Sequence, residues 1–460
     1  MTETEKYEKL TGERVEKLIL RLAAPTVLSM LISTLYNMAD AFFVGQINAS
    51  ASGAISVVFS YMAIIQAFGF FFGHGSGNYM SLRLGEQNRE EAEKMSATGF
   101  FSSLAFGTIL MTLGLIFMRP LVIALGSTDT IRPYAEEYLF FILLGTPYMT
   151  AALTVNNQLR FQGSAFYAMI ALVSGGVLNI GLDAAFVMGL NMGTAGAGLA
   201  TAISQLCSFV LLLVGTGRGG NIRLRIRNFR FEKKYFSAIV KGGLPSLGRQ
   251  GISGVATVCT NFVCGAVMGV NADPMIAALG NVTKITGFCS SVIIGFGQGF
   301  QPVCGFNYGA KKYDRVIKSY VFALACTTGF ALVVSVAGFA FAGPVTAAFT
   351  VDELAREYSR IAFRAQCAFF ALTPFITISN MLLQNIGKVV RATTLAVARQ
   401  GIAYIPLVFL GGFLMGATGL EVAQAAADLL TAIICVPIAV PVLVGIKRLA
   451  SLKPQETARE

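Results

Sequence analysis

Long apolar stretches constrain the fold of this chain more than any other feature of its sequence. Roughly a dozen segments of about 20 to 28 residues carry almost no charge, and each can cross the ~30 Å hydrocarbon core of a bilayer as a helix. Hydrophobic residues make up 55% of the 460 residues and charged residues only 13%, which excludes an ordinary soluble domain. The alternating segments of about ten residues that build a membrane β-barrel do not occur. The sequence therefore predicts an all-α polytopic membrane protein.

Twelve spans are expected, and an even number places both termini on the same side of the membrane. Most Lys and Arg residues lie in the loops that follow the even-numbered spans, with Arg119 and Arg132 as the main exceptions. By the positive-inside rule, we expect a multi-pass membrane protein with both termini in the cytoplasm. The expected spans are 17–44, 53–81, 95–118, 133–155, 165–188, 195–217, 238–269, 275–303, 317–341, 355–382, 393–414 and 419–445.

The net charge of +11 does not indicate a nucleic-acid-binding protein, because the basic residues form no single patch. The most basic loop, 218–234, lies near the middle of the chain and fits an orientation signal and linker. Binding of anionic lipid head groups by this loop is the alternative. The eight cysteines lie in or beside apolar segments without a CxxC pair, so we expect reduced packing residues rather than disulfides or a metal site.

The two halves of the sequence resemble each other at an offset of about 220 to 227 residues. Pro25 in the first span matches Pro245 in the seventh, and Pro147 matches Pro374. Such prolines remove helical hydrogen bonds, so kinks or hinges are expected at them. An even number of spans per half predicts two parallel, pseudo-symmetric six-helix lobes around a central cleft. The expected N-lobe is 1–232, with the linker loop 218–234 at its end, and the expected C-lobe is 233–460.

Polar residues inside the expected spans are the candidates for function. Asp40 lies in the first span with no basic residue near it in sequence, and a carboxylate in such surroundings by default marks an ion or proton site. Asp183 lies in the fifth span with Asn179 on the same helix face, and Tyr36 shares the face of Asp40 in the same way. Oxygen groups of this kind suit a proton or Na⁺. The alternative, a polar cluster that only fixes helix packing, explains poorly why two acids lack a basic partner.

The second half offers weaker candidates. Lys284 lies inside the eighth span, where it could line a cavity and repel or orient a substrate, pair with an acid, or extend toward the interface. Asp428 in the last span is a candidate cavity or gating residue, although pairing with a nearby Arg or Lys is favoured for it. Arg399 is expected near the cytoplasmic side or a helix end. Further candidates for cavity or gating roles, with tight-turn packing as the alternative, are Gln298, Gln301 and Asn307.

Three stretches resemble the multidrug and toxic compound extrusion (MATE) family, in particular its bacterial MepA/DinF-like branch. They are 36–45, 179–183 and 297–310, and the resemblance extends over essentially the whole chain. It implies a cation-coupled (H⁺ or Na⁺) antiporter that exports amphipathic, often cationic compounds by alternating access. A NorM-like acid in the seventh span is missing from 257–262. The resemblance assigns the coupling ion, including any Na⁺, to Asp40, Asn179, Asp183 and Thr201, which the polar residues Tyr36, Asn37 and Gln205 would support.

No enzyme signature is found in the sequence. The glycine-rich stretch 73–78 follows no strand and lacks the Lys of a P-loop, so transport driven by an ion gradient is expected rather than ATP hydrolysis. We expect a monomer without a cofactor, whose partners are small-molecule drugs or toxic organic cations and membrane lipids, not nucleic acid. A flippase for a lipid-linked precursor is the alternative, and it would need a strongly cationic cavity, for which Lys284 is thin support. A passive channel would not explain a pair of carboxylates confined to one half.

Overall fold

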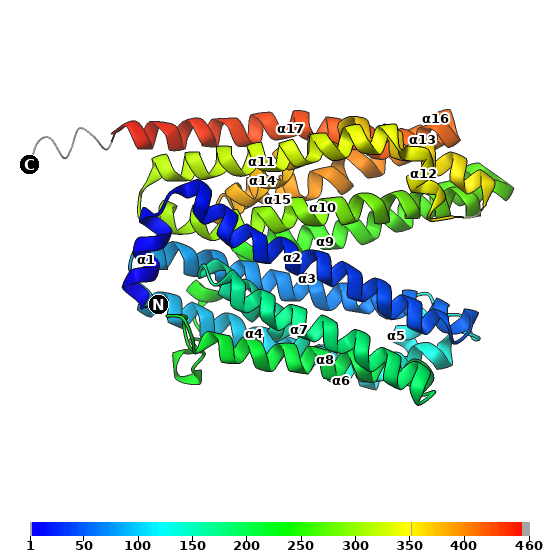
Figure 1. Cartoon of the computed structure of the whole chain (residues 1–460), viewed down its shortest axis with the longest axis horizontal. Coiled ribbons are helices and arrows are strands. Elements are labelled where there is room, and N and C mark those ends of the chain that lie inside the picture. Colours follow the sequence, from blue (N-terminus) through cyan, green and yellow to red (C-terminus); the bar gives the residue numbers. More distant parts are fainter. Residues whose placement is uncertain (1, 351, 453–460) are drawn as a thin grey trace, which may run out of the picture. The chain divides into compact units, whose positions relative to one another are not determined.

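The computed structural model describes residues 2–350 and 352–452, and nearly all of them are helical (Figure 1). Ten continuous helices in this part of the chain are long and apolar enough to cross a membrane, and the bent pair α13 and α14 passes the same test jointly. One of the ten, Lys233–Gly309, contains both α9 (Lys233–Met268) and α10 (Ala272–Gly309), joined by the short 3-10 turn η3 (Gly269–Asn271). With α9 and α10 taken separately, the structure has the twelve spans that hydropathy predicts, and the all-α membrane fold is confirmed.

The contacts between residues divide the chain into two compact units. Unit 1 comprises 1–13 and 21–247, and unit 2 comprises 14–20 and 248–460. In unit 1, α6 packs against α3, α4 and α8, and α7 packs against α8. Its helices are α1 (Glu3–Gly12), most of α2 (Val15–Gly45), α3 (Ala49–Gly85), α4 (Arg89–Ile116), α5 (Met118–Ala124), α6 (Arg132–Phe161), α7 (Ala165–Asp183), the π-helical η1 (Ala184–Gly189), α8 (Gly193–Thr216), η2 (Ile226–Asn228) and the first part of α9.

Unit 2 continues from the remainder of α9 with a second series of helices, in which the bent pair α13 and α14 takes the place of α6. Its last helix, α17, packs against α13, α14 and α16. The helices that follow α10 are α11 (Tyr313–Ala340), α12 (Ala342–Ala347), α13 (Glu353–Phe370), α14 (Thr373–Asn385), α15 (Val389–Val397), the π-helical η4 (Ala398–Tyr404), α16 (Ile405–Met415) and α17 (Ala417–Leu452).

The internal repeat extends to single hydrogen bonds and backbone angles. The Asn156 side chain donates to the Ala168 carbonyl at 3.1 Å, and Asn380 donates to the Ala392 carbonyl at 2.6 Å. Each pair is related by an offset of 224 residues (156 to 380, 168 to 392). At the same offset, Gly163 and Gly387 end a helix with φ of 75° and 74°, a conformation that costs glycine little. The two units are therefore copies of one helical plan.

Three of the four prolines lie inside continuous helices. The helices α2, α6 and α9 continue through Pro25, Pro147 and Pro245, so the chain stays helical at these three positions, where a kink or hinge remains a prediction. At Pro374 the expectation holds, since α13 and α14 meet at 55° and Pro374 is in the first turn of α14. A proline in the first turn of a helix has no hydrogen bond to lose, so it suits the start of a new segment.

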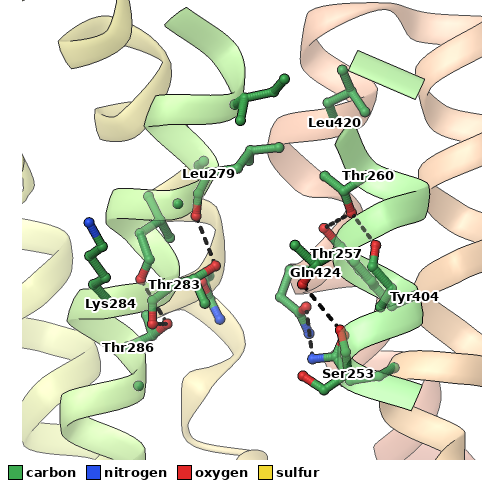
Figure 2. A pocket seen from close by; sticks show the side chains of 18 of the residues that line it. Ser253, Thr257, Thr260, Leu279, Thr283, Lys284, Thr286, Tyr404, Leu420 and Gln424 are labelled. Carbon is green, nitrogen blue, oxygen red and sulfur yellow. Dashed lines mark hydrogen bonds between the residues drawn. The ribbon is translucent and has the colours of Figure 1, made fainter. Parts of the chain in front are cut away.

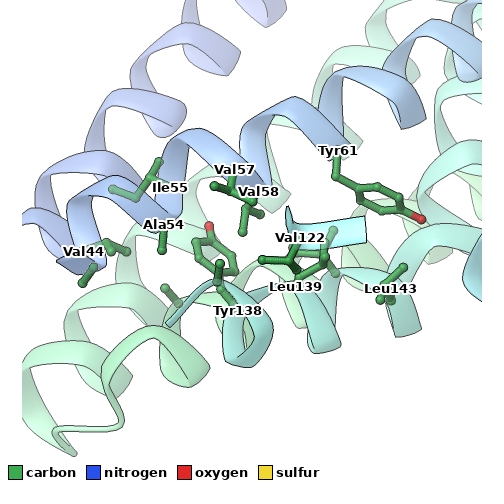
Figure 3. Packing of buried hydrophobic residues seen from close by; sticks show 14 of the residues in the cluster. Val44, Ala54, Ile55, Val57, Val58, Tyr61, Val122, Tyr138, Leu139 and Leu143 are labelled. Atoms are coloured by element: carbon green, nitrogen blue, oxygen red, sulfur yellow. The ribbon is translucent and has the colours of Figure 1, made fainter. Parts of the chain in front are cut away.

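The core of unit 1 lies where α6 meets α3 and α5. Tyr138 and Leu139 of α6, Val58 of α3 and Val122 of α5 are all fully buried (Figure 3). This cluster fixes α6 against the helices that carry polar groups. Because Tyr138 has a hydroxyl group at the end of its buried ring, that hydroxyl needs a partner inside the protein.

Candidate functional site

The partner of Tyr138 is Asp40. The Tyr138 hydroxyl donates to Asp40 Oδ2 at 2.6 Å, and the Asp40 residue is only 4% exposed. Asp40 lies on α2 and Tyr138 on α6, so the contact joins two helices that are distant in sequence. A hydrogen bond from a hydroxyl to a carboxylate is among the stronger ones in proteins and fixes the orientation of the acid.

Asp183 is the last residue of α7, where the helix changes to the π-helical segment η1. It is fully buried, and the charge of Asp40 acts on it across the site. One turn earlier, Asn179 Nδ2 donates to Thr201 Oγ1 of α8 at 3.4 Å. Single π turns inside α-helices are frequent at functional sites, because they rotate the side chains that follow. The structure thus brings Asp40, Asn179, Asp183 and Thr201 into one region of unit 1.

Glycines in α7 allow this close arrangement. A Cβ atom on Gly175 would meet the backbone carbonyl of Ser204 at 3.0 Å and clash with the side chain of Ser208 in α8. A Cβ on Gly176 would lie 3.3 Å from the Tyr36 ring in α2. Small residues permit such approaches between helices in a membrane, where no hydrophobic effect drives them together. α7 therefore places its polar face between α2 and α8.

Several oxygen atoms of this site have no partner among the described residues. They are Asp40 Oδ1, Asn179 Oδ1, both carboxylate oxygens of Asp183 and the Ser204 hydroxyl. Neither acid forms an ion pair with a described basic residue. Buried polar atoms without hydrogen bonds are costly, and a proton or a cation held by oxygen atoms would satisfy them. The donor set fits Na⁺ as well as H⁺, through the Asp40 and Asp183 carboxylates, the Asn179 amide oxygen and the Thr201 hydroxyl.

The supporting polar residues predicted for the first half, Tyr36, Asn37 and Gln205, lie on the same two helices as Asp40 and Thr201. The Tyr36 hydroxyl interacts with the Gln205 side chain, and Asn37 is half-buried next to Tyr36 on α2. Tyr138 and Ser204 were missed as members of the site from the sequence. Neither residue type is unusual in an apolar span, and only the packing of α6 and α8 brings them to the acids.

A cavity of about 520 Å³ lies in unit 2, between α9, α10, α13, η4 and α17. Lys284 is one of its lining residues and is exposed, on α10 (Figure 2). Gln298, Gln301 and Asn307 do not line this cavity. All three are buried: Asn307 accepts from Arg315 at 2.8 Å, and the Gln301 carbonyl accepts from Asn385 at 2.9 Å. The hydrogen bonds of Asn307 and Gln301 are therefore contacts of helix packing.

Asp428 has the basic partner that Asp40 lacks. Arg399 donates to both of its carboxylate oxygens, at 2.6 and 3.1 Å, and Gln424 donates to Oδ1 at 3.1 Å. Pairing with a basic residue was the favoured interpretation of Asp428. Arg399 was expected near the cytoplasmic side or a helix end; it lies in the π-helical η4, inside the span Val389–Met415 rather than at its end, and its side of the membrane remains a prediction. A guanidinium that is largely removed from solvent, as that of Arg399 is, favours such a carboxylate partner.

The sequence profile of the MatE family matches residues 25–185 and 251–410. The chain belongs to this family. The two matched segments fall in the two halves of the repeat, and the first includes Asp40, Asn179 and Asp183. The predicted membership of the MATE family is confirmed.

Curated relatives of this MATE chain include two proteins named multidrug export protein MepA. The protein of Staphylococcus haemolyticus is 25% identical over 408 residues, which cover 88% of each chain. That of Staphylococcus aureus is 24% identical over the same length, covering 88% of this chain and 89% of the relative.

Solved structures share the fold. A MATE crystal structure in complex with MaL6 superposes with a TM-score of 0.89 at 24% identity and covers 96% of this chain and 99% of its own. The outward-facing conformation of a multidrug resistance MATE family transporter of the MOP superfamily also has a TM-score of 0.89 at 24% identity, covering 96% of this chain and 98% of its own. At this identity the likeness concerns the fold.

Proposed function

We propose that the chain is a multidrug efflux antiporter coupled to H⁺ or Na⁺, which exports amphipathic, often cationic compounds by alternating access. The observation that carries the proposal is the pair of buried acids, Asp40 and Asp183, with three carboxylate oxygens that have no partner among the described residues. The names of the MepA relatives support drug export, and membership of the MATE family supports a transporter rather than an enzyme.

In the proposed mechanism, the acids of unit 1 are the coupling site. A proton on Asp183, or a Na⁺ ion between the two carboxylates, removes the cost of a buried, unpaired charge. Tyr138 holds one oxygen of Asp40, so the other remains directed to the ion. Loading the site then favours one conformation of the transporter, and unloading favours another. Export results when ion and drug prefer different conformations, because each shifts the equilibrium only by its differential affinity.

Replacing each acid tests this mechanism. We expect Asp40→Asn and Asp183→Asn to lose gradient-driven dye transport in proteoliposomes by at least about tenfold, since an amide neither binds the proton nor supplies its charge. Uptake of ethidium is measured with an imposed H⁺ gradient and, separately, an imposed Na⁺ gradient, which also identifies the coupling ion. The matched control is Asp273→Asn, which removes an exposed acid at the start of α10 and is expected to transport normally. Normal transport by both site variants would disprove the coupling site.

The proposed location is the bacterial cytoplasmic membrane, with both termini in the cytoplasm, the N-lobe at 1–232 and the C-lobe at 233–460. The charge distribution of the loops supports this orientation. No specific observation favours a flippase. The positive charge of Arg399 in the unit 2 cavity is neutralised by Asp428, and the same wall contains Glu421. A pyrophosphate head group would require a cavity with unpaired positive charges.

A further inference from the structure

The cavity of unit 2 has a polar wall that the coupling site does not use. Hydroxyl and amide groups from α9, α10 and α17 line it, and Ser253, Thr257, Thr283 and Gln424 are seen around it in Figure 2. The Thr260 and Tyr404 hydroxyls are 3.0 Å apart on this wall, and Gln400 donates to Gln424 at 3.4 Å. The volume of the cavity, about 520 Å³, is in the range of binding sites for drug-sized molecules.

Glu421 is the unusual residue of this wall. It lies on α17, is only 5% exposed and lines the cavity. Its Oε1 atom is buried and has no hydrogen-bond partner in the described ranges, and no described basic residue forms an ion pair with it. Glu357 of α13, which is exposed, adds a second negative charge close enough to act on Glu421. A buried acceptor without a partner, on a residue that lines a cavity, requires a donor that a ligand in the cavity would supply.

No other described charge of the cavity forms an ion pair with Glu421. Arg399 is held by Asp428 through two hydrogen bonds, so that pair contributes little net charge. Lys284 is exposed on α10, and Figure 2 shows it on the opposite side of the view from Tyr404 and Gln424. Glu421 is therefore the unpaired negative charge of this wall and attracts cations, against the opposing charge of Lys284.

We propose that Glu421 binds the protonated amine of a transported compound in the unit 2 cavity and selects ammonium groups that carry an N–H over quaternary ones. The reason is the open Oε1 atom. An N–H of an ammonium group donates a charge-assisted hydrogen bond to it, whereas a trimethylammonium group attracts the carboxylate but has nothing to donate. This inference rests on the proposed function, in that the bound amine is the exported compound.

The test compares two probes that differ by one methyl group. They are dansylamidoethyl-dimethylamine, which is protonated at pH 7, and its trimethylammonium analogue. Equilibrium binding to the purified full-length protein is measured by fluorescence anisotropy. For the native protein we expect the amine to bind about tenfold more tightly than the quaternary probe, which is the contribution of about one charge-assisted hydrogen bond. In Glu421→Gln the ratio of the two dissociation constants is expected to fall to about one, because a neutral amide accepts only a weaker bond.

Three further variants separate the proposal from misfolding and from general charge effects. Glu421→Asp keeps the carboxylate and is expected to retain a preference for the amine. Glu357→Gln removes the exposed neighbouring acid. We expect it to weaken the binding of both probes equally and to leave the ratio of their dissociation constants unchanged. Lys284→Gln removes a positive charge from the cavity and is expected to tighten the binding of both cationic probes. The neutral probe dansylamide reports whether the cavity of each variant remains intact. An unchanged ratio in a Glu421→Gln protein that still binds dansylamide overturns the proposal.

Binding at equilibrium and transport under a gradient distinguish this proposal from the function it rests on. If the native protein selects the amine through Glu421 but moves neither probe under an imposed gradient, the antiporter function is wrong and the binding site stands. If gradient-driven transport is normal but Glu421→Gln binds and transports both probes like the native protein, the antiporter stands and the site at Glu421 is wrong.

Discussion

Buried acids in this protein differ in what surrounds them, and their surroundings indicate their roles. Asp428 is fully buried but shares two hydrogen bonds with Arg399. Asp40 has only the Tyr138 hydroxyl, and Asp183 has no hydrogen-bond partner within the described residues. A paired buried acid stabilises one structure, whereas an unpaired one changes its free energy when an ion binds. The same residue type thus serves structure in unit 2 and, in our proposal, coupling in unit 1.

The Arg399–Asp428 pair yields a prediction for stability. Asp428→Asn leaves the partly buried guanidinium of Arg399 without a counter-charge, which typically costs about 1–3 kcal/mol, so the variant should unfold at a lower temperature. Unfolding is followed in detergent with a thiol-reactive fluorophore, because Cys264, Cys304, Cys367 and Cys435 are free and buried.

The matched control for this pair removes both partners. Arg399→Gln with Asp428→Asn leaves no charge unpaired, so it should lose less stability than Asp428→Asn alone. Glu357→Gln, at an exposed position of α13, should unfold like the native protein. A double variant that is as unstable as the single one would show that the pairing of charge is not the cause.

At the scale of single elements, α1 shows how a short helix is held at the surface. It begins with a capping box between Thr2 and Glu5. Lys6 of α1 donates to Ser164 at 2.8 Å and to Asn221, while Glu3 pairs with Arg89 at 2.7 Å. Burial and the positive charge of Arg89 lower the pKa of Lys6, while the negative charge of Glu3 raises it. The net result is a shift of this pKa from 10.5 to about 7.

This pKa predicts that the docking of α1 depends on pH. Undocked α1 exposes Lys6 and restores its ordinary pKa, so between about pH 7 and 10.5 the undocked state binds more protons. Docking should therefore strengthen as the pH rises through this window and be weakest below pH 7. A nitroxide label at Glu8→Cys, an exposed position of α1, should lose mobility between pH 6.5 and 9 in a background without native cysteines.

Two substitutions check the origin of that effect. Lys6→Met removes the buried amine and should abolish the pH dependence of the label. Lys9→Met, on the same helix, should leave it unchanged, since no hydrogen bond or ion pair of the Lys9 side chain is found in the described structure. A label that responds to pH in the same way in both variants contradicts the role of Lys6.

At the scale of the whole molecule, the loops predict the orientation in the membrane. Thr128 is exposed in a loop with few basic residues, and Arg225 is exposed in the most basic loop. In a cysteine-free background, Thr128→Cys should react with a membrane-impermeant maleimide in intact cells, and Arg225→Cys should react only after the cells are opened. The reverse pattern would invert the proposed topology. Reaction of both residues in intact cells would indicate leaky cells, which a cytoplasmic marker protein detects.

Duplication preserved the helices of the two units more closely than their chemistry. Gly163 and Gly387, and the hydrogen bonds of Asn156 and Asn380, are repeated, and both units contain a π-helical segment, η1 and η4. Asp183 directly precedes η1, whereas η4 contains Arg399. At the offset of 224, Asp183 corresponds to Leu407 and Arg399 to Gly175, so neither charge is repeated in the other unit, and the two units suit different ligands in our proposals.

Hydropathy and spacing along the chain were enough to predict the all-α membrane fold, the twelve spans and the repeat, because the bilayer imposes span length and the chain alone determines spacing. They also located Asp40 and Asp183, since an acid in an apolar span is visible in sequence. Packing decided the rest. Tyr138 beside Asp40, Arg399 beside Asp428 and the open oxygen of Glu421 depend on which helices lie side by side, and hydrogen bonds between distant segments leave no periodic pattern in a sequence.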